Sequence, residues 1–377
     1  MNKIVITHIP ARYMGYHRYL ILGFHELKNQ GKIKFSIKPS NLISALLYRE
    51  FRFYYFIKKY CSFLLRSKKD SLTMHGYITD GKKKTYFAYD NDDTPYHFCI
   101  EELKRVSFYF KAQCPITIEE KGFEIAPGSF IKYQPEALQF KNKIYPSMLA
   151  PLYNCNNLYS YTELLAQYKT MLHESIKKEK MLMTYFGNAR GPIPMESSIP
   201  DLFHNEEQLL GHFKGKVSHP NEKRAVASKI IAAMGSNYDA RVIDDGFRDE
   251  NKQLKNKHLF IPLATYNKHI SQFKYNLNIA GYRTSIPYRF VQSFAVGTAI
   301  LTDKLKVKWY RPFDKEVVET VEMGYRLMED VDWDSFKQTV LNLPEITYEE
   351  VLTEFNEKWT PVAFASYIVN TLTAKTL

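Results

Sequence analysis

The sequence has few cysteines, and they are poorly placed for metal or disulfide chemistry. They lie far apart and include no CxxC pair: Cys61, Cys99, Cys114 and Cys155. This spacing argues against a zinc site and against a disulfide-stabilised scaffold, because both need closely spaced or paired cysteines. It favours a reducing environment, and we therefore expect a cytoplasmic protein.

Long apolar runs are also missing. No stretch of about 18 uncharged apolar residues occurs, so the sequence predicts no transmembrane helix. The first ten residues, MNKIVITHIP, lack the charged lead, the apolar core and the small-residue cleavage site of a signal peptide, and we expect none. Membrane contact, if it occurs, is then expected at the surface.

The length and the composition are those of an ordinary folded protein. A chain of 377 residues is near the size at which one hydrophobic core divides into two, so we expect two domains. Hydrophobic residues make up 45% and charged residues 24%, which argues against a disordered chain, a collagen or a coiled coil.

Acidic residues are scarce in the first 70 residues. This segment holds 14 Lys and Arg against three acids, whereas the remaining 307 residues hold 38 basic and 37 acidic groups. Nearly all of the formal net charge of +12 is therefore concentrated near the N-terminus. A basic field confined to one part of the chain predicts that an anionic partner approaches that part.

Residues 42–66, LISALLYREFRFYYFIKKYCSFLLR, give this basic field a shape. Helical spacing places Arg52, Lys59 and Arg66 on one stripe. Apolar residues fall roughly opposite: Ile43, Leu46, Ile57, Cys61 and Leu64. A helix that mixes basic and aromatic residues suits docking at the surface of an anionic membrane. The pattern also fits a helix packed inside the protein, and nucleic-acid binding is a third alternative.

Short β-branched or aromatic runs alternate with longer amphipathic stretches, which predicts an α/β fold. The predicted strands are residues 3–9, 34–38 and 85–90, followed by 181–188, 240–244, 258–264, 274–281 and 298–303. Residues 161–180 separate the two series as a helical spacer rich in Lys and Glu. We expect two α/β domains, residues 1–175 and 176–347. The apolar spacing after residue 348 predicts a C-terminal helical segment, 348–377, that packs back on the first domain.

Residues 274–310 have the clearest local signals in the chain. They predict a strand, a glycine turn, a polar loop, a helix of about ten residues, a glycine stop and a second strand. Ser285 is the expected N-cap, Pro287 falls in the first turn, and Gly297 ends the helix. The start of the helix then lies at the carboxyl end of a strand, where ligands bind in open α/β sheets.

Cationic side chains surround this predicted helix start. A helix N-terminus with free N–H groups binds phosphate, and Arg283 and Arg289 would reinforce it, with Ser285 and Tyr288 beside them. The arrangement predicts a diphosphate site. The alternative is an ordinary βαβ unit whose arginines face water.

The segment RFVQSFAVGTAILTD, residues 289–303, resembles the donor-binding helix and following strand of GT-B glycosyltransferases. The sequence also resembles that of exostosin-like bacterial glycosyltransferases, over roughly residues 180–345. The family commonly has an acidic residue five positions before the glycine, where it holds the ribose of the nucleotide sugar. Here Gln292 stands five positions before Gly297, and an amide can also bond a hydroxyl.

The resemblance implies two Rossmann-like lobes of the GT-B kind, with a nucleotide-sugar as donor substrate and no other cofactor. Arg190, in the segment FGNAR, matches a basic side chain that family members place against the donor phosphates. Arg224 follows Lys223 at the start of another predicted helix, where the helix dipole disfavours cations unless an anion lies nearby. We therefore add Arg224 to the donor site, although solvated charges at a helix start are an alternative.

Glycosyl transfer with inversion needs a base within reach of the acceptor hydroxyl, and the first lobe should supply it. Asp92 and Asp93, in the segment DNDDTP, are expected to lie exposed at the carboxyl end of a strand, and His17 follows the first strand. These three residues are the catalytic candidates. The alternative for DNDDTP is that Asp93 or Thr94 caps the next helix. We expect no essential metal, because arginines and the helix dipole can neutralise the leaving diphosphate.

Together these features predict a glycosyltransferase that moves a sugar from a nucleotide-sugar to a glycan acceptor. The basic first lobe and the resemblance favour a lipid-linked acceptor, as in lipopolysaccharide or capsule assembly. They also favour peripheral docking on the anionic inner face of the cell membrane, with no nucleic-acid partner. Two rival functions remain: a basic nucleic-acid-binding protein, and another two-lobe sugar-nucleotide enzyme such as an epimerase.

Overall fold

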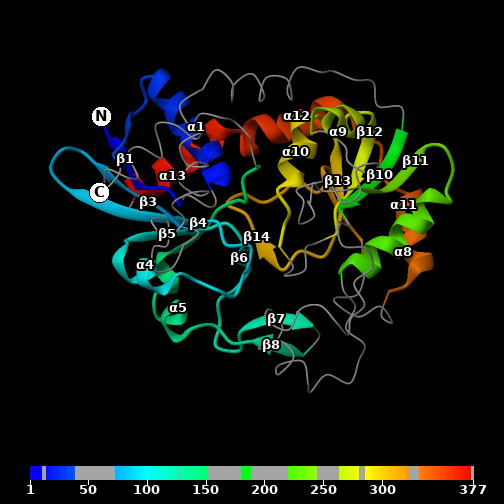
Figure 1. The fold of residues 1–377 in the computed structure, drawn as a ribbon, viewed down its shortest axis with the longest axis horizontal. Helices are drawn as coiled ribbons and strands as arrows, with labels where there is room; N and C mark the ends of the chain where they lie inside the picture. Colours follow the sequence, from blue (N-terminus) through cyan, green and yellow to red (C-terminus); the bar gives the residue numbers. More distant parts are fainter. Residues whose placement is uncertain are drawn as a thin grey trace, which may run out of the picture.

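The computed structural model describes residues 1–10, 14–38, 73–126, 128–151, 180–187, 220–243, 263–279, 285–321 and 331–374. These residues form two large sheets flanked by helices, together with two small two-stranded sheets (Figure 1). The basic segment 42–66 lies outside the described residues, as does the predicted spacer helix apart from Lys180. The domain boundary near residue 175 also falls there and stays a prediction.

The first sheet has six strands in the order β2-β1-β3-β4-β5-β9. They are β2 (Lys34–Ile37), β1 (Lys3–His8), β3 (Thr73–Thr79), β4 (Lys84–Asp90), β5 (Phe108–Lys111) and β9 (Ile144–Pro146). Strand β3 pairs antiparallel with both of its neighbours, and all other pairs are parallel. The strands β1, β4 and β5 therefore point the same way, and their carboxyl ends share one edge of the sheet.

The second sheet is parallel throughout and has the order β11-β10-β12-β13-β15. Its strands are β10 (Lys180–Gly187), β11 (Tyr238–Ile243), β12 (Phe273–Leu277), β13 (Ala299–Asp303) and β15 (Val318–Val321). Numbered along the chain, this is the doubly wound order 2-1-3-4-5. The strand order reverses between β10 and β12, and such a switch point is where ligands bind in this kind of sheet.

Helices and short strands complete the described fold. The helices are α1 (Met14–Asn29), α4 (Ile100–Arg105), α5 (Pro135–Gln139), α8 (Pro220–Ala232), α9 (Leu263–Ile270), α10 (Arg289–Ala295), α11 (Trp333–Leu341), α12 (Tyr348–Glu354) and α13 (Pro361–Ala374). The short helical turns are η3 (Lys141–Lys143) and η5 (Phe355–Trp359), and the short strands are β6 (Cys114–Pro115), β7 (Phe123–Ala126), β8 (Ser129–Ile131) and β14 (Val307–Lys308). No helix in the described ranges is long and apolar enough to span a bilayer.

Helix α13 packs against α1 of the first unit (Figure 1). The contact is close because Gly23 has no side chain: a Cβ atom built there would lie 1.9 Å from the carbonyl oxygen of Pro361. The Tyr19 hydroxyl donates a 2.5 Å hydrogen bond to the carbonyl oxygen of Trp359 at the start of the crossing. These contacts confirm the α/β class with two sheets and the C-terminal helix that returns to the first unit.

The chain crosses between the units through a buried aromatic cluster. The fully buried Trp359 ring lies 5.3 Å from Trp309, 5.0 Å from Phe313 and 6.3 Å from Phe294, measured between ring centroids. The apolar core is continuous from the first sheet through this cluster to α10. Aromatic pairs at these separations add to the stability that burial alone provides. The two units are thus joined by hydrophobic packing.

A carboxyl group is buried at this crossing. Trp359 Nε1 donates to Glu354 Oε1 at 2.9 Å, and Lys358 Nζ lies 2.6 Å from Glu354 Oε2. Burial raises the pKa of Glu354 to about 7; a hydrogen bond shared with Asp314 acts in the same direction, against Lys358 and Trp359. The folded chain therefore binds this proton more tightly than the unfolded chain, so the carboxyl stabilises the fold at acidic pH.

The Glu354→Gln substitution should flatten the pH dependence of stability. The stabilisation from Glu354 is fully present below pH 4.5, the ordinary pKa of a Glu carboxyl, and is lost as the pH rises through about 7. Unfolding by urea between about pH 5 and pH 8 should show the natural chain losing about 2–3 kcal/mol relative to the variant. Glu357→Gln, an exposed neighbour, is the control and should follow the natural curve. Parallel curves for the natural chain and Glu354→Gln would contradict the expectation.

Two predictions about local structure are wrong. Residues 258–264 were expected to form a strand, but Leu263 begins α9, and residues 258–262 lie outside the described part of the chain. The helix expected to start after Ser285 begins at Arg289. Its predicted stop is confirmed: Gly297 has a φ of +67°, and a Cβ there would lie 2.1 Å from the Tyr348 ring.

Candidate active site

The carboxyl edge of the first sheet meets the second unit just before α10. The side-chain amide of Gln113 donates to the carbonyl oxygen of Ile286 at 2.9 Å and accepts from the Ile286 N–H at 3.0 Å. Strand β6 pairs with β14 beside this contact, and the rings of Tyr16 and Tyr288 lie 6.3 Å apart. Loops from both units therefore converge on one place.

Gln113 also explains why the helix starts late. It holds both backbone groups of Ile286, and Pro287 disfavours a helical conformation at the residue before it. Ser285 is buried ahead of the helix, and the N-cap is Tyr288, whose side chain makes no capping bond. The predicted cap at Ser285 is therefore wrong, while Tyr288 and Arg289 do lie at the start of the helix.

Two arginines meet at the carboxyl end of β12. Arg289 Nε donates to Asn278 Oδ1 at 3.1 Å, and Arg224 Nη2 donates to the carbonyl oxygen of Ile279 at 2.9 Å. Arg224 comes from α8, near its start as predicted, and Arg289 opens α10. Asn278 and Ile279 directly follow β12, which borders the switch point of the sheet. The second unit thus presents guanidinium groups at its expected ligand edge.

The electrostatics of this pair favour an anion. Burial lowers the pKa of Arg224 to about 10, and the positive charge of Arg289 acts in the same direction, whereas Asp303 raises it. Like charges brought together in a poorly solvated place repel, and an anion between them would relieve the repulsion. Asn278 adds a donor, because its buried Nδ2 makes no hydrogen bond with the described part of the chain. The predicted binding of a diphosphate at this place stays a prediction.

The other predicted donor-site residues are less informative. Gln292 is buried within α10, and its predicted ribose contact stays a prediction. Arg190 and Arg283 lie outside the described residues. Within the described ranges, no group of three or more His, Cys, Asp or Glu side chains could hold a metal ion. The predicted independence from metals stays a prediction.

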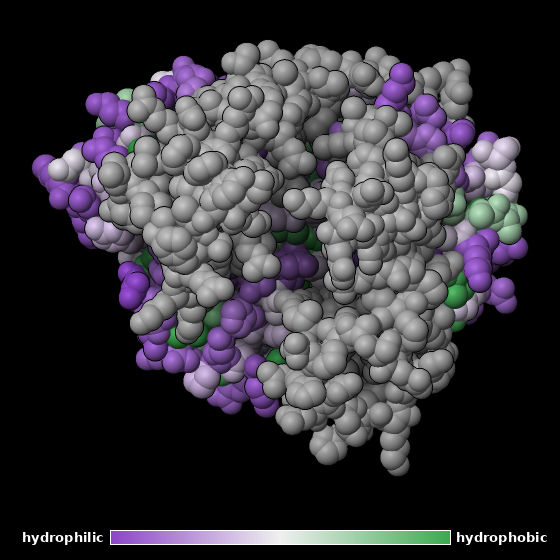
Figure 2. Space-filling model, viewed as in Figure 1, coloured by the Kyte–Doolittle hydropathy of each residue, from purple (hydrophilic) through white to green (hydrophobic). Residues whose placement is uncertain are grey.

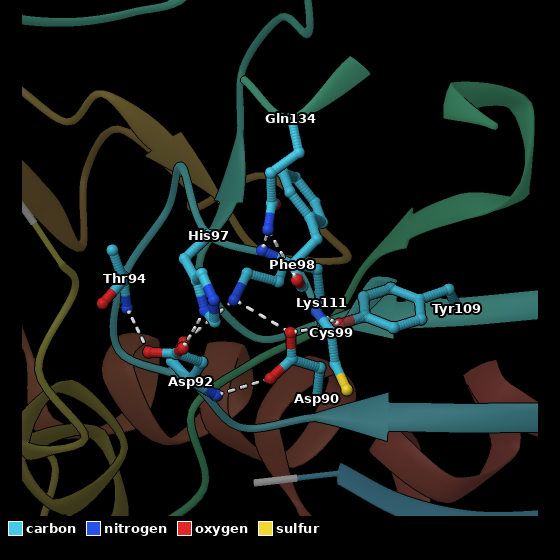
Figure 3. Close-up of polar contacts among 9 residues, drawn as sticks. All are labelled: Asp90, Asp92, Thr94, His97, Phe98, Cys99, Tyr109, Lys111 and Gln134. Carbon is cyan, nitrogen blue, oxygen red and sulfur yellow. Dashed lines mark hydrogen bonds and ion pairs between the residues drawn. The ribbon is translucent and has the colours of Figure 1, made fainter. Parts of the chain in front are cut away.

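On the first unit, a buried ion pair lies at the carboxyl ends of β4 and β5 (Figure 3). Lys111 Nζ lies 3.0 Å from Asp90 Oδ2, and the two side chains are 0% and 2% exposed. The Tyr109 hydroxyl donates to the same oxygen at 2.5 Å, and the Asp92 N–H donates to Asp90 Oδ1 at 2.8 Å. With so many partners, Asp90 and Lys111 fix the start of the loop that follows β4.

This loop holds Asp92 away from solvent. Asp92 Oδ1 accepts from the Thr94 N–H at 2.9 Å, and Asp92 Oδ2 lies 2.8 Å from His97 Nδ1. Burial raises the pKa of Asp92, but His97, Lys111 and Thr94 outweigh it and leave the pKa well below its ordinary value. The prediction that Asp92 is exposed is wrong, since its side chain is 16% exposed. A carboxylate with a lowered pKa is also a weak proton acceptor.

The other two catalytic candidates differ in their exposure to solvent. Asp93 is exposed, as predicted, whereas His17 is fully buried on α1, with its Nδ1 3.4 Å from Asn91 Nδ2. The alternative of a helix cap at Asp93 or Thr94 is wrong. Helix α4 begins at Ile100 with Cys99 as its N-cap. The catalytic roles of Asp93 and His17 stay predictions.

Sequence analysis missed several residues at the carboxyl edges of the two sheets. They are Asp90, His97, Lys111 and Gln113 in the first unit and Asn278 in the second. Lys111 ends the apolar run FYFK, which by itself predicts an exposed lysine at a strand end. Gln113 and Asn278 act through contacts with residues far away in sequence. For His97, the histidine five positions after Asp92 was the available signal, but no established motif has that spacing.

Comparisons with known proteins return distant structural likenesses. No protein-family model and no curated protein matches the chain. A structure of the GtfA/B complex is 9% identical, with a TM-score of 0.35, and covers 73% of this chain; the match spans about half, 54%, of that chain. AviGT4, a glycosyltransferase involved in avilamycin A biosynthesis, is 12% identical, with a TM-score of 0.32 over 72% of this chain and 77% of its own.

A third likeness extends over nearly the whole chain. It is a variant of S. aureus TarM in complex with fondaparinux, α-GlcNAc-glycerol and UDP. The identity is 8% and the TM-score 0.38, covering 99% of this chain and 100% of that one. With scores of this size, we base the proposed function on the geometry of this chain.

Proposed function

We propose that this protein is a GT-B-like glycosyltransferase that transfers a sugar from a nucleotide-sugar donor to a glycan acceptor. The observation that carries the proposal is the pair Arg224 and Arg289 at the carboxyl end of β12. Two guanidinium groups and the amide hydrogens of Asn278, which make no hydrogen bond with the described residues, match the charge and the acceptor oxygens of a diphosphate. The doubly wound sheet presents them at the edge where nucleotides bind.

The edge of the first sheet that meets the second unit supports sugar transfer rather than nucleotide binding alone. Gln113, which follows β5, and Tyr16, near the start of α1, bring the first unit against the residues that precede α10. This edge of the first unit carries carboxylates and histidines that can take a proton from an acceptor hydroxyl. When the bond from the sugar to the donor phosphate breaks, the arginines stabilise the charge on the leaving diphosphate. In this proposal no metal is required, and activity should survive addition of EDTA.

The acceptor and the location are finer parts of the proposal. We propose a lipid-linked glycan, as in lipopolysaccharide or capsule assembly, and docking on an anionic membrane. Lys3 pairs with Lys34 in register, and the β3–β4 turn exposes Lys82, Lys83 and Lys84. Described residues at this end of the molecule are mainly hydrophilic (Figure 2). Such a basic edge, together with the basic segment 42–66, supports contact with anionic lipid headgroups.

A thermal-shift panel tests the donor. UDP, GDP, CMP and ADP, each with a representative sugar conjugate, are added in turn to the purified chain. A ligand at 100 times its dissociation constant stabilises the fold by about 2.7 kcal/mol. One nucleotide class should therefore clearly raise the melting temperature of the chain. DNA and RNA oligonucleotides serve as the comparison. Silence across the nucleotides together with a shift for the oligonucleotides would contradict the proposal and favour a nucleic-acid-binding protein.

A further inference from the structure

His97 has the geometry of a proton acceptor. Its side chain is 58% exposed, while its Nδ1 lies 2.8 Å from Oδ2 of the largely buried Asp92 (Figure 3). A carboxylate at Nδ1 favours the tautomer that carries its proton there, which leaves the lone pair of Nε2 available for another molecule. The buried partner and the exposed ring together resemble the orienting acid and the base of a catalytic pair.

The loop that carries the ring is fixed on both sides of His97. On one side, Asp92 is fixed by the Thr94 N–H and by Lys111 Nζ, which donates to the Asp92 carbonyl oxygen at 3.3 Å. On the other side, the Gln134 amide holds both backbone groups of Phe98, accepting from its N–H at 3.0 Å and donating to its carbonyl oxygen at 3.2 Å. A base positioned before the substrate binds costs little reorganisation during the reaction.

The Asp92–His97 pair differs in its position in the fold from a second histidine–aspartate pair. His269 and Asp239 also pair, with Nε2 3.0 Å from Oδ2, but Asp239 lies near the amino end of β11, and the His269 side chain is only 22% exposed. The pair Asp92–His97 follows the carboxyl end of β4, on the edge that meets the second unit through Gln113. The same chemistry therefore occurs twice in the described residues, and only the Asp92–His97 copy lies on the sheet edge that meets the second unit.

We propose that His97 is the general base of an inverting transfer, with Asp92 as the residue that positions it; the inference rests on the proposed function. The acceptor oxygen forms a bond to the anomeric carbon as the bond from that carbon to the donor phosphate breaks. The electron pair of the broken bond leaves with the diphosphate. The acceptor proton passes to His97 Nε2, and Asp92 stabilises the imidazolium that results.

Other candidates suit this step less well. Asp92 is engaged by His97 and Thr94, and its lowered pKa makes it a weak base. His17 is fully buried. In the described part of the chain, Asp92 pairs with the His97 ring, and Lys111, which is paired with Asp90, contacts the Asp92 carbonyl oxygen. Lys111 holds Asp90, while Thr94 and His97 hold Asp92, so the exposed His97 ring is more open to an acceptor than either carboxylate.

The test compares His97→Gln with His269→Gln, the matched pair away from the site. Transfer is measured with UDP-glucose, UDP-N-acetylglucosamine and GDP-mannose as donors and with octyl glycosides as lipid-like acceptors. His97→Gln should lower kcat about 10²–10⁴-fold, keep the donor KM and the nucleotide thermal shift, and remove the acidic limb of the profile of kcat/KM against pH. His269→Gln should leave all of these unchanged. Proton NMR of the product should show inversion at the anomeric carbon.

Several outcomes would overturn the inference. They are near-normal kcat in His97→Gln, an acidic limb that persists in it, or retention of anomeric configuration. A much larger loss from Asp93→Asn than from His97→Gln would assign the base to Asp93 instead. If the natural chain neither binds nor transfers from any donor, the proposed function fails as well; if it transfers normally and only the His97 result is negative, this inference alone fails.

Discussion

Replacing Arg289 by alanine should lower kcat/KM for the nucleotide sugar about 10²–10³-fold, the usual cost of removing one preorganised donor from a developing negative charge. Arg289 is anchored by Asn278 at 3.1 Å and lies close enough to Arg224 to lower the pKa of that residue. Removing its charge leaves the diphosphate with one guanidinium instead of two. Steady-state kinetics with the donor identified by thermal shift measure the loss.

The control for this substitution lies in the same unit. Lys229→Ala removes an exposed cation from the last turn of α8, the helix that carries Arg224, and should change kcat/KM less than about twofold. If Arg289→Ala and Lys229→Ala have the same rate as the natural chain, the arginine pair does not hold the donor. A large loss in both would indicate a general effect of net charge.

The second large effect is expected in stability. Lys111→Met removes the cationic partner of Asp90 at a place where the Asp90 side chain is 2% exposed, with Tyr109 and a backbone N–H as the remaining donors. Breaking a buried ion pair from one side costs about 3–5 kcal/mol, because the remaining charge stays out of water. Urea unfolding followed by circular dichroism should show the loss, and Asp90→Asn combined with Lys111→Met should recover part of it.

An exposed ion pair nearby provides the comparison. Lys104 Nζ lies 3.3 Å from Glu136 Oε1, with side chains 45% and 33% exposed. Because water screens this pair, Lys104→Met should cost no more than about 0.5 kcal/mol. Equal losses from Lys111→Met and Lys104→Met would mean that Lys111 does not compensate a buried charge.

Much of the fold could be predicted from local sequence. The runs that became β1, β4, β12 and β13 are short, β-branched or aromatic, and bounded by turn residues, so their pattern already predicts strands. Strand β3 was missed because TMHGYIT contains a histidine and a glycine that hide its alternation. The Asp80–Gly81 turn that joins it to β4, with a φ of +104° at Gly81, was the available hairpin signal.

The candidate site was predictable where chemistry follows from local position. Arg289 was found because it opens a helix that follows a strand, and Arg224 because a cation near a helix start is unfavourable unless an anion lies nearby. The start of α10 was misplaced because Gln113, 173 residues away, holds Ile286 in a non-helical conformation. Asp90, Lys111 and His97 were missed for a related reason: burial and pairing depend on which strands become neighbours, and that information is not local.

Calorimetric titration with nucleoside diphosphates tests the central claim most directly. UDP and GDP are titrated into the natural chain and into Arg289→Ala, with uridine and guanosine as ligands that lack the diphosphate. If Arg224 and Arg289 form the donor site, one diphosphate should bind at least about 100-fold more tightly than its nucleoside, and most of this difference should disappear in Arg289→Ala. Equal affinity for nucleoside and diphosphate, or a diphosphate affinity unchanged by Arg289→Ala, would contradict the account.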